Sequence, residues 1–298
     1  MLTNEDMMLT NKVIILIVFA LAVVFNLQSV AHADGHSEIL FEEDFESVTL
    51  GDSVEEGIKG VTVWSKEGPK GWVVKNDFTL KDPDVPLPDG LGIEEWTGWS
   101  FPQLEWWVQT AENQGRGNWK KAAGVVAVAD PDEWDDEKID GKSPDDVVKF
   151  NSILSTPTID LKSIEANSVV LQFDSSFRME KNQDFEIHVS FDGKAPIVLM
   201  SATSDDSDES VAAATFHDGS TEAFATSEDK VEFPMSIKVT NPEGAKSMVF
   251  SWAMLDADND WWWALDNIVI TGVKSKVSTP VEANGKLATT WGAIRSFK

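Results

Sequence analysis

The chain has 298 residues, with 24 Lys and Arg against 51 Asp and Glu and a formal net charge of −27. So much negative charge repels phosphate backbones and excludes nucleic-acid binding through a basic face. The absence of Cys excludes disulfides, thiolate-bound metals and thiol nucleophiles, and four His leave little for a His-rich metal centre.

The first 33 residues have the pattern of an export signal. Lys12 precedes an apolar run over 13–25, and Ala31-His32-Ala33 has the small-x-small form of a signal-peptidase site. The run is too short for a membrane span of roughly 20 residues. We predict a signal peptide over 1–33, cleaved after Ala33; the alternative is an uncleaved anchor helix. Cleavage implies a secreted protein, extracellular or periplasmic, without a membrane span.

The rest of the chain is dominated by short segments in which apolar and polar residues alternate, the pattern of half-buried strands. In 185–191, for example, Phe185, Ile187 and Val189 share one face. Pro234 indicates an edge strand or a bulge within 231–239. Many short strands without helical crossovers predict an all-β antiparallel sandwich over 34–274. In chain order the candidate strands are 39–45, 61–64, 72–74, 106–109, 125–129, 168–174, 185–191, 231–239, 247–254 and 264–270.

Several stretches depart from the strand pattern. Residues 81–92 and 201–227 are rich in turn-forming residues, and we predict loops there. Residues 130–146 are acidic and turn-rich, and their cluster 130–136 either binds Ca²⁺ or forms a solvated loop. Residues 275–298 read as a linker followed by a basic tail, in contrast to the acidic domain before it. The tail is either a segment for sorting, anchoring or docking, or a frayed terminal helix.

Four motifs appear in an order that resembles a known module. They are Phe41–Glu46, Gly71-Trp72, Ser155–Leu161 and the run Trp262-Trp263-Ala264-Leu265-Asp266-Asn267-Ile268. Together they resemble MAM-like and cleaved-adhesin-like jelly-roll modules. With 126–136 added, the chain is similar to the non-catalytic domains of secreted bacterial calcineurin-like phosphoesterases. The resemblance implies a jelly-roll sandwich for adhesion or substrate attachment, often with structural Ca²⁺.

The catalytic motifs of such phosphoesterases are missing from the sequence. Their two metals require Asp-x-His, Gly-Asp and Gly-Asn-His elements, and the nearest counterpart is His217-Asp218-Gly219, which lacks its companions. We therefore expect no catalytic residues and no enzyme activity.

Calcium is the cofactor that the acidic residues favour, because Ca²⁺ binds several oxygen ligands. Asp256, Asp258 and Asp260 have the acidic spacing that opens an EF-hand loop, but Trp261 stands where that loop needs Gly. We expect a β-loop Ca²⁺ site that uses some of these three side chains.

The jelly-roll resemblance implies a second arrangement for the ion. In such modules acids of the first strand meet the Asp of the last strand, which here brings Glu43 or Asp44 to Asp266. Asp266 shares its parity with Ile268, so its side chain is expected to point inward, where a carboxylate needs a partner. The alternative is an Asp266 that is hydrogen-bonded to turn amides.

The 13 Trp favour a carbohydrate ligand, because flat indoles stack on sugar rings. Trp96, Trp99, Trp106 and Trp107 form the candidate platform, with acidic residues between them. The alternative is that a sandwich without Tyr uses Trp to fill its core.

Two main functions remain, and a third is weaker. The first is a secreted, non-enzymatic adhesion module for an extracellular glycan. The second is a structural or attachment protein that binds a cell-surface protein. The third is a diverged hydrolase with a carboxylate site.

Overall fold

The computed structural model describes residues 36–82, 84, 90–136, 142–180, 183–204, 211–259 and 261–275. The predicted signal peptide, the predicted tail from 276 onward and Asp260 lie outside these residues. The chain divides into a unit from Met1 to His36 and a unit from Ser37 to Lys298, and the described helices and strands all belong to the second. None of the described helices is long and apolar enough to cross a membrane.

The smaller of the two main sheets contains the first and last strands of the chain side by side. Its pairs are antiparallel, and its order is β1, β15, β8, β13, with β5 beside β15. The strands are β1 (Ser37–Glu43), β15 (Trp263–Val273), β8 (Val169–Phe177), β13 (Glu232–Val239) and β5 (Ala127–Ala129). Within the described residues β13 pairs only with β8, which confirms the edge position that Pro234 predicted.

The larger sheet has the order β12, β11, β10, β9, β14, β6, β4, with β7 beside β14, and is also antiparallel. Its strands are β12 (Thr221–Ala225), β11 (Val211–Phe216), β10 (Ile197–Ser204), β9 (Asp184–Phe191), β14 (Ser247–Ala257), β6 (Val148–Ser155), β4 (Val73–Leu80) and β7 (Ile159–Asp160). A separate hairpin joins β2 (Gly51–Asp52) to β3 (Thr62–Trp64).

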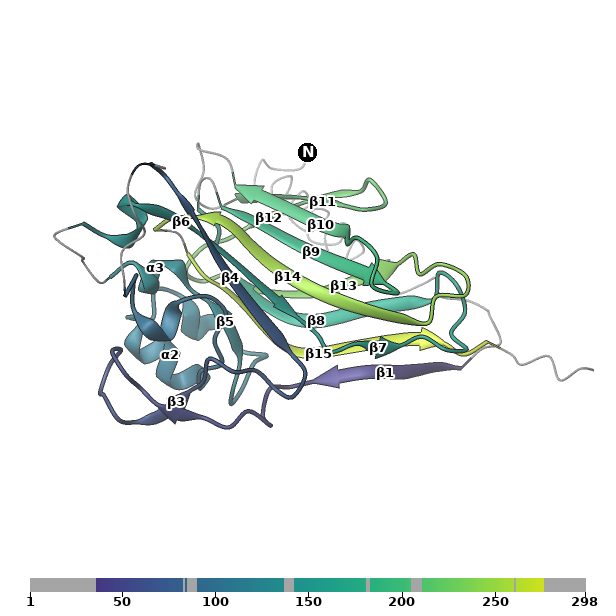
Figure 1. The fold of residues 1–298 in the computed structure, drawn as a ribbon, viewed down its shortest axis with the longest axis horizontal. Coiled ribbons are helices and arrows are strands. Elements are labelled where there is room, and N and C mark those ends of the chain that lie inside the picture. The colour runs from purple at the N-terminus through teal and green to yellow at the C-terminus, as the bar shows by residue number, and fades with distance from the viewer. Residues whose placement is uncertain are drawn as a thin grey trace, which may run out of the picture. The chain divides into compact units, whose positions relative to one another are not determined.

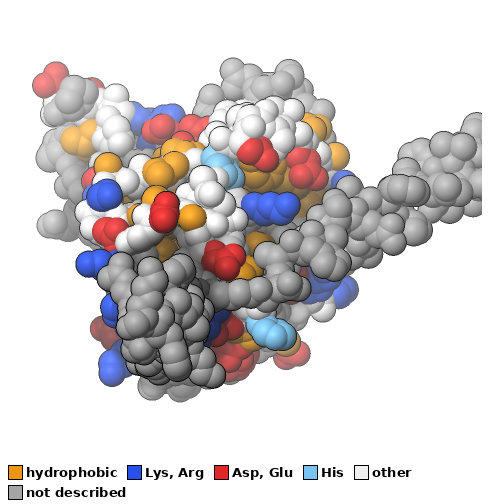
Figure 2. Space-filling model, turned by 90° about the vertical axis from the view of Figure 1, so that its right-hand side faces the viewer, with side chains coloured by type: hydrophobic (Ala, Val, Ile, Leu, Met, Phe, Trp, Pro, Cys, Tyr) orange, Lys and Arg blue, Asp and Glu red, His pale blue; other side chains and the backbone are white. Residues whose placement is uncertain are grey.

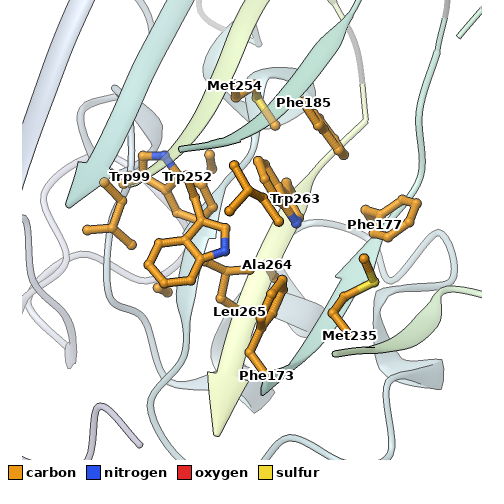
Figure 3. Close-up of a cluster of buried hydrophobic side chains, with 14 of the residues drawn as sticks. Trp99, Phe173, Phe177, Phe185, Met235, Trp252, Met254, Trp263, Ala264 and Leu265 are labelled. Carbon is orange, nitrogen blue, oxygen red and sulfur yellow. The ribbon is translucent and has the colours of Figure 1, made fainter. Parts of the chain in front are cut away.

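The two main sheets pack face to face around an aromatic core (Figures 1 and 3). Trp263 of β15 stacks on Phe185 of β9 with ring centres 4.5 Å apart, and Phe173 of β8 meets Trp252 of β14 edge-on at 5.6 Å. Such pairs add about 0.5–1.5 kcal/mol each to the free energy of their burial. The predicted all-β jelly-roll sandwich is confirmed.

The segment between β4 and β6 forms a partly helical insertion at one end of the sandwich (Figure 1). It contains 3₁₀ turns η2 (Glu94–Trp96), η3 (Arg116–Asn118) and η4 (Pro144–Asp146), and helices α2 (Leu104–Thr110) and α3 (Pro131–Trp134). The strand predicted over 106–109 was wrong, since this stretch is α2. Trp107 and Ala111, four residues apart, are both buried, as one face of a helix requires.

The predicted loop over 201–227 was also wrong over most of its length. The end of β10 and the whole of β11 and β12 lie there. Ala212 and Ala214 of β11 are buried and alternate with the more exposed Ala213 and Thr215. Small residues therefore take the core positions of this hairpin.

Candidate functional site

The predicted Trp platform is mostly buried. Trp96, Trp99 and Trp107 are at most 1% exposed. Trp99 lies between the sheets with its ring 5.7 Å from Trp263 (Figure 3), and its indole N–H donates to Ser152 O. These three indoles fill the core, so the prediction that they form an exposed sugar platform was wrong.

Trp106 is the remaining member of that platform, and it is half-buried. Its ring stacks on Trp96 at 5.5 Å, with 22° between the planes. The outward turn of α2 leaves part of this one indole open, so a role for Trp106 in ligand binding stays a prediction.

A buried guanidinium organises the acidic stretch that begins at Asp130. Arg116 is fully buried; its Nε and Nη2 donate to both oxygens of Asp130, at 2.9 and 3.0 Å. Nη2 also meets Asp132 at 3.0 Å and Glu133 at 3.1 Å. The guanidinium lies 4.5 Å above the ring of Trp262, a cation–π contact. One cation thus serves three carboxylates.

Negative charge remains in excess around Arg116. Burial raises the pKa of Glu133 to about 9, and the neighbouring charge of Asp130 adds to the rise while Arg116 opposes it. Burial likewise raises the pKa of Asp135 to about 7, although a hydrogen bond from Asn259 lowers it. Glu133 and Asp135 therefore hold their protons to higher pH than exposed acids do.

Oxygens of Asp130, Asp132 and Glu133 lie within 4.8 Å of one another, close enough to share one metal ion. In the structure the guanidinium of Arg116 pairs with all three carboxylates. It supplies the positive charge that a metal ion would otherwise bring. The sequence analysis offered a Ca²⁺ site or a solvated loop for this cluster. It did not connect Arg116 with these acids, and the solvated loop was wrong for Asp130, Glu133 and Asp135, which are buried.

Asp266 points inward, as its parity predicted, and is 2% exposed. Its carboxylate accepts hydrogen bonds from the amides of Asn267 at 2.7 Å and Ala123 at 3.3 Å. Burial raises its pKa to about 7, and the charges of Glu46 and Asp174 contribute. Asp174 is the register partner of Asp266 on β8, and its carboxylate lies 3.7 Å from the ammonium of Lys121.

The acid of the N-terminal segment that meets Asp266 is Glu46, which corrects the expectation for Glu43 and Asp44. Glu43 accepts hydrogen bonds from the amide of Phe45 at 2.9 Å and from the indole of Trp72 at 3.1 Å. Asp44 accepts one from the amide of Glu46. Phe45 has a positive φ of 58°. This turn places Glu46 beside Val125, and the carboxylate of Glu46 accepts a hydrogen bond from the amide of Val125 at 3.0 Å.

The acidic row at the end of β14 does not assemble around a common point in the described residues. Asp256 is exposed on a bulge, with φ at 53°, and Asp258 pairs with Lys81 at 2.8 Å. Because an ammonium already neutralises Asp258, the predicted loop site finds no support in Asp256 and Asp258.

The outer face of the larger sheet carries a continuous line of side chains, which we call the cross-strand row. Register pairs Val73 with Ser155, Ser155 with Ser251, Ser251 with His188 and His188 with Val198. These five residues therefore lie side by side on β4, β6, β14, β9 and β10. The end residues Val73 and Val198 are 58% and 43% exposed, and the three polar residues between them are half-buried.

Hydrogen bonds preorganise the middle of this row. Ser155 Oγ and Ser251 Oγ lie 2.8 Å apart, and His188 Nε2 lies 2.7 Å from a carboxylate oxygen of Glu186.

The face drawn in Figure 2 carries basic and acidic side chains scattered among apolar and uncharged ones. Among the described residues there, charge of one sign does not gather in a single patch.

Comparison with known proteins leaves the family open. No family model and no curated protein matches the chain. Among solved structures, it is similar to the K1 cleaved adhesin domain of Lys-gingipain from Porphyromonas gingivalis, with 16% identity and a TM-score of 0.39. That match covers 79% of this chain and 98% of the other.

Two other solved structures illustrate the range of these similarities. One is a carbohydrate-binding module with specific mannan recognition, with 11% identity and a TM-score of 0.32 over 80% of this chain and 98% of the other. The other is a cyclase from Fischerella sp., with 10% identity and a TM-score of 0.38 over 80% and 98%. Similarities this distant assign no ligand and no activity. The MAM-like and phosphoesterase-associated parts of the sequence resemblance stay predictions.

Proposed function

We propose that this chain is an exported, non-catalytic binding module that holds a glycan along the cross-strand row and uses Ca²⁺ to stabilise its fold. The observation that carries the proposal is the row itself, a preorganised line of polar side chains with an exposed apolar residue at each end.

The chemistry of the row fits an extended sugar chain. Neighbouring strands are about 4.8 Å apart, so five strands span about 19 Å, which is long enough for several sugar rings. Ser155, Ser251 and His188 offer hydrogen-bond donors and acceptors to sugar hydroxyls. The side chains of Val73 and Val198 offer apolar contact to the C–H faces of rings. No charged ligand is required.

Calcium is proposed at Asp266, with Glu46 and Asp174 as further carboxylate ligands. These three acids come from distant parts of the sequence. Burial raises the pKa of Asp266, the amides of Asn267 and Ala123 oppose the rise, and the charges of Glu46 and Asp174 add to it. Lys121 lies 3.7 Å from Asp174 at the rim of this group and is the one described cation paired with it. A bound cation would hold Asp266 in its ionised form and tie the N-terminal segment to β8 and β15.

A glycan array probed with Ca²⁺-loaded protein tests the ligand class, followed by calorimetric titration of the strongest binder. His188→Ala and Ser251→Ala are expected to weaken binding at least about tenfold, a loss of about 1.4 kcal/mol. Trp106→Ala is the comparison variant, because Trp106 on α2 is the other candidate ligand-binding position. It is expected to leave the affinity for the glycan unchanged. Loss of binding in Trp106→Ala alone would move the site to α2. Absence of glycan binding would favour the alternative of a protein partner.

Metal content tests the calcium proposal. Elemental analysis of dialysed protein is expected to find bound Ca²⁺, and Asp266→Asn to lose one equivalent. Chelator is expected to lower the Tm of the wild type more than that of Asp266→Asn. A Tm that does not respond to chelator would contradict the proposal.

A further inference from the structure

Arg178, just after β8, carries a guanidinium that forms no ion pair with any carboxylate of the described residues. Its side chain is half-buried, and its backbone amide donates to the carbonyl of Trp262 at 3.3 Å. Arg116, the other Arg in the described part of the chain, pairs with three carboxylates. In a chain with 51 Asp and Glu, the unpaired charge of Arg178 stands out.

Two contacts hold this guanidinium in place. Its Nη1 donates to the carbonyl of Gln114 at 2.9 Å, and its Cζ lies 3.9 Å from the ring centre of Trp261, a cation–π contact. Gln114 belongs to a run from Glu112 to Gly115 in which every φ is positive, from 37° to 103°. Such backbone strain in non-Gly residues collects at ligand-binding segments. The guanidinium is therefore positioned before any ligand arrives.

Donors of both stacked side chains have no acceptor. Arg178 Nε and the indole Nε1 of Trp261 are buried and make no hydrogen bond to a described residue. Burial lowers the pKa of Arg178, the charges of Glu228 and Glu180 oppose this effect, and the charge of Arg116 adds to it. A guanidinium keeps its charge in proteins. A buried donor without an acceptor is costly, so a charged one indicates a missing anion.

We propose that Arg178 and Trp261 form a binding site for the carboxylate of an acidic ligand, with the uronic acid unit of a glycan as the ligand class. A carboxylate matches the guanidinium edge, which forms two parallel hydrogen bonds to it through Nη2 and Nε. Nε is enclosed in the free protein, so the second bond follows a side-chain adjustment of the kind common at binding sites. The half-buried indole of Trp261 offers apolar contact to the sugar ring.

Charge and position separate this site from the others. The net charge of −27 disfavours a dianion such as phosphate more than a carboxylate with a single charge. The site lies where β8 ends, beside the Glu112–Gly115 run of the insertion, whereas the cross-strand row lies on the outer face of the larger sheet. The carboxylate site therefore does not depend on the proposed function of that row.

NMR of the Arg side chains tests the site directly, because the chain has only three Arg: Arg116, Arg178 and Arg295. Titration with glucuronate is expected to shift the Nε–H signal of Arg178 and to leave that of Arg116 in place, since Arg116 is already paired. Arg178→Lys assigns the signal by removing it. Glucose, which lacks the carboxylate, is the control ligand and is expected to cause no shift.

Calorimetric titration with glucuronate gives the affinity. Arg178→Met is expected to weaken binding at least about tenfold. Lys230→Met is the matched control, because Lys230 also lies over an aromatic ring, that of Phe233 at 5.7 Å, and is exposed. His188→Ala is expected to leave glucuronate binding unchanged, so failure of the cross-strand row is distinguishable from failure of this site.

Acetate separates the two sources of a carboxylate. Tighter binding of glucuronate than of acetate would assign the site to a sugar acid, and equal affinities would assign it to the carboxylate group alone. If Arg178→Met does not fold, the NMR titration of the wild type still decides the question. An Arg178 signal that moves with neither ligand, or unchanged affinity in Arg178→Met, would overturn the proposal. Asp260, which lies outside the described residues, would then be the candidate anion for Arg178.

Discussion

Arg116 is the residue that balances the charge of the insertion. It is fully buried, bonds to three carboxylates and donates to the carbonyl of Ala111 at 2.9 Å. Removal of such a cation leaves its anions without compensation in a poorly solvated place.

Arg116→Met is therefore expected to lower the free energy of unfolding by about 3–5 kcal/mol, as measured by urea denaturation. The control is Lys162→Met, which breaks the exposed pair with Asp160 and should leave the free energy of unfolding nearly unchanged, because water and salt screen an exposed ion pair. Equal effects of the two variants would show that the buried cluster has no special weight.

Glu133 gives the cluster a pH dependence. Its pKa is raised to about 9 from a usual value of 4.5, so between these values the folded state binds more protons than the unfolded state. Stability contributed by this proton is present at low pH and is lost as the pH rises toward about 9. Glu133→Gln keeps an acceptor for Arg116 and carries no charge. Urea denaturation between pH 6 and pH 9 is expected to show a shallower decline for the variant; parallel curves would contradict this assignment.

The inward or outward direction of a side chain was predictable from the sequence only within strands, where it alternates from one residue to the next. Parity places Asp266 inside, and the structure confirms it. The acid that meets it is Glu46 and not Glu43 or Asp44, because the positive φ of Phe45 ends the alternation just before Glu46. Alternation along the sequence does not show where such a turn falls.

At the scale of elements, Gly124 lies just before β5, and its missing side chain leaves room for the carboxylate of Glu46. A Cβ at this position would lie 1.8 Å from Glu46 Oε1, and φ is +67°. Gly219→Ala is the control, because Gly219 has φ at +83° with open space around it.

Gly219→Ala should cost about 1–2 kcal/mol from backbone strain alone. Gly124→Ala is expected to lose more stability in urea denaturation and to weaken Ca²⁺ binding at Asp266, since Glu46 must move. An equal loss in the two variants, with Ca²⁺ affinity unchanged, would contradict this role for Gly124.

Elements with large apolar residues at every second position were predicted well, among them β8, β9, β13, β14 and β15. The prediction missed β10 and also β6, although buried Val148, Phe150 and Leu154 of β6 alternate with less buried residues. It also failed where the signal changes character. In α2, adjacent Trp106 and Trp107 suggested a strand, yet Leu104, Trp107, Val108 and Ala111 have helical spacing. In β11, Ala residues fill the core positions, and their small apolar side chains give a weak alternation.

At the scale of the whole molecule, a net charge of −27 opposes the compact state. Added salt screens this repulsion, since the Debye length falls to about 10 Å at 0.1 M. The Tm is therefore expected to rise with NaCl, and CaCl₂ at equal ionic strength to raise it further through specific binding. Identical curves for the two salts would show that charge screening alone acts.

The sandwich architecture was predictable from the sequence, but the cross-strand row was not. Its five residues lie on strands whose order and register arise only when the sheet has formed. Ser155 and Ser251, for example, are 96 residues apart and become neighbours at 2.8 Å. The Trp residues gave a stronger signal in the sequence, and most of them serve the core.

The central claim is that the outer face of the larger sheet holds the ligand. A crystal structure of the protein with the oligosaccharide that binds most tightly tests it most directly. The account predicts sugar rings lying across β4, β6, β14, β9 and β10, with hydrogen bonds to Ser251 and His188. A sugar bound beside Trp106, or found cleaved in the crystal, would contradict the account.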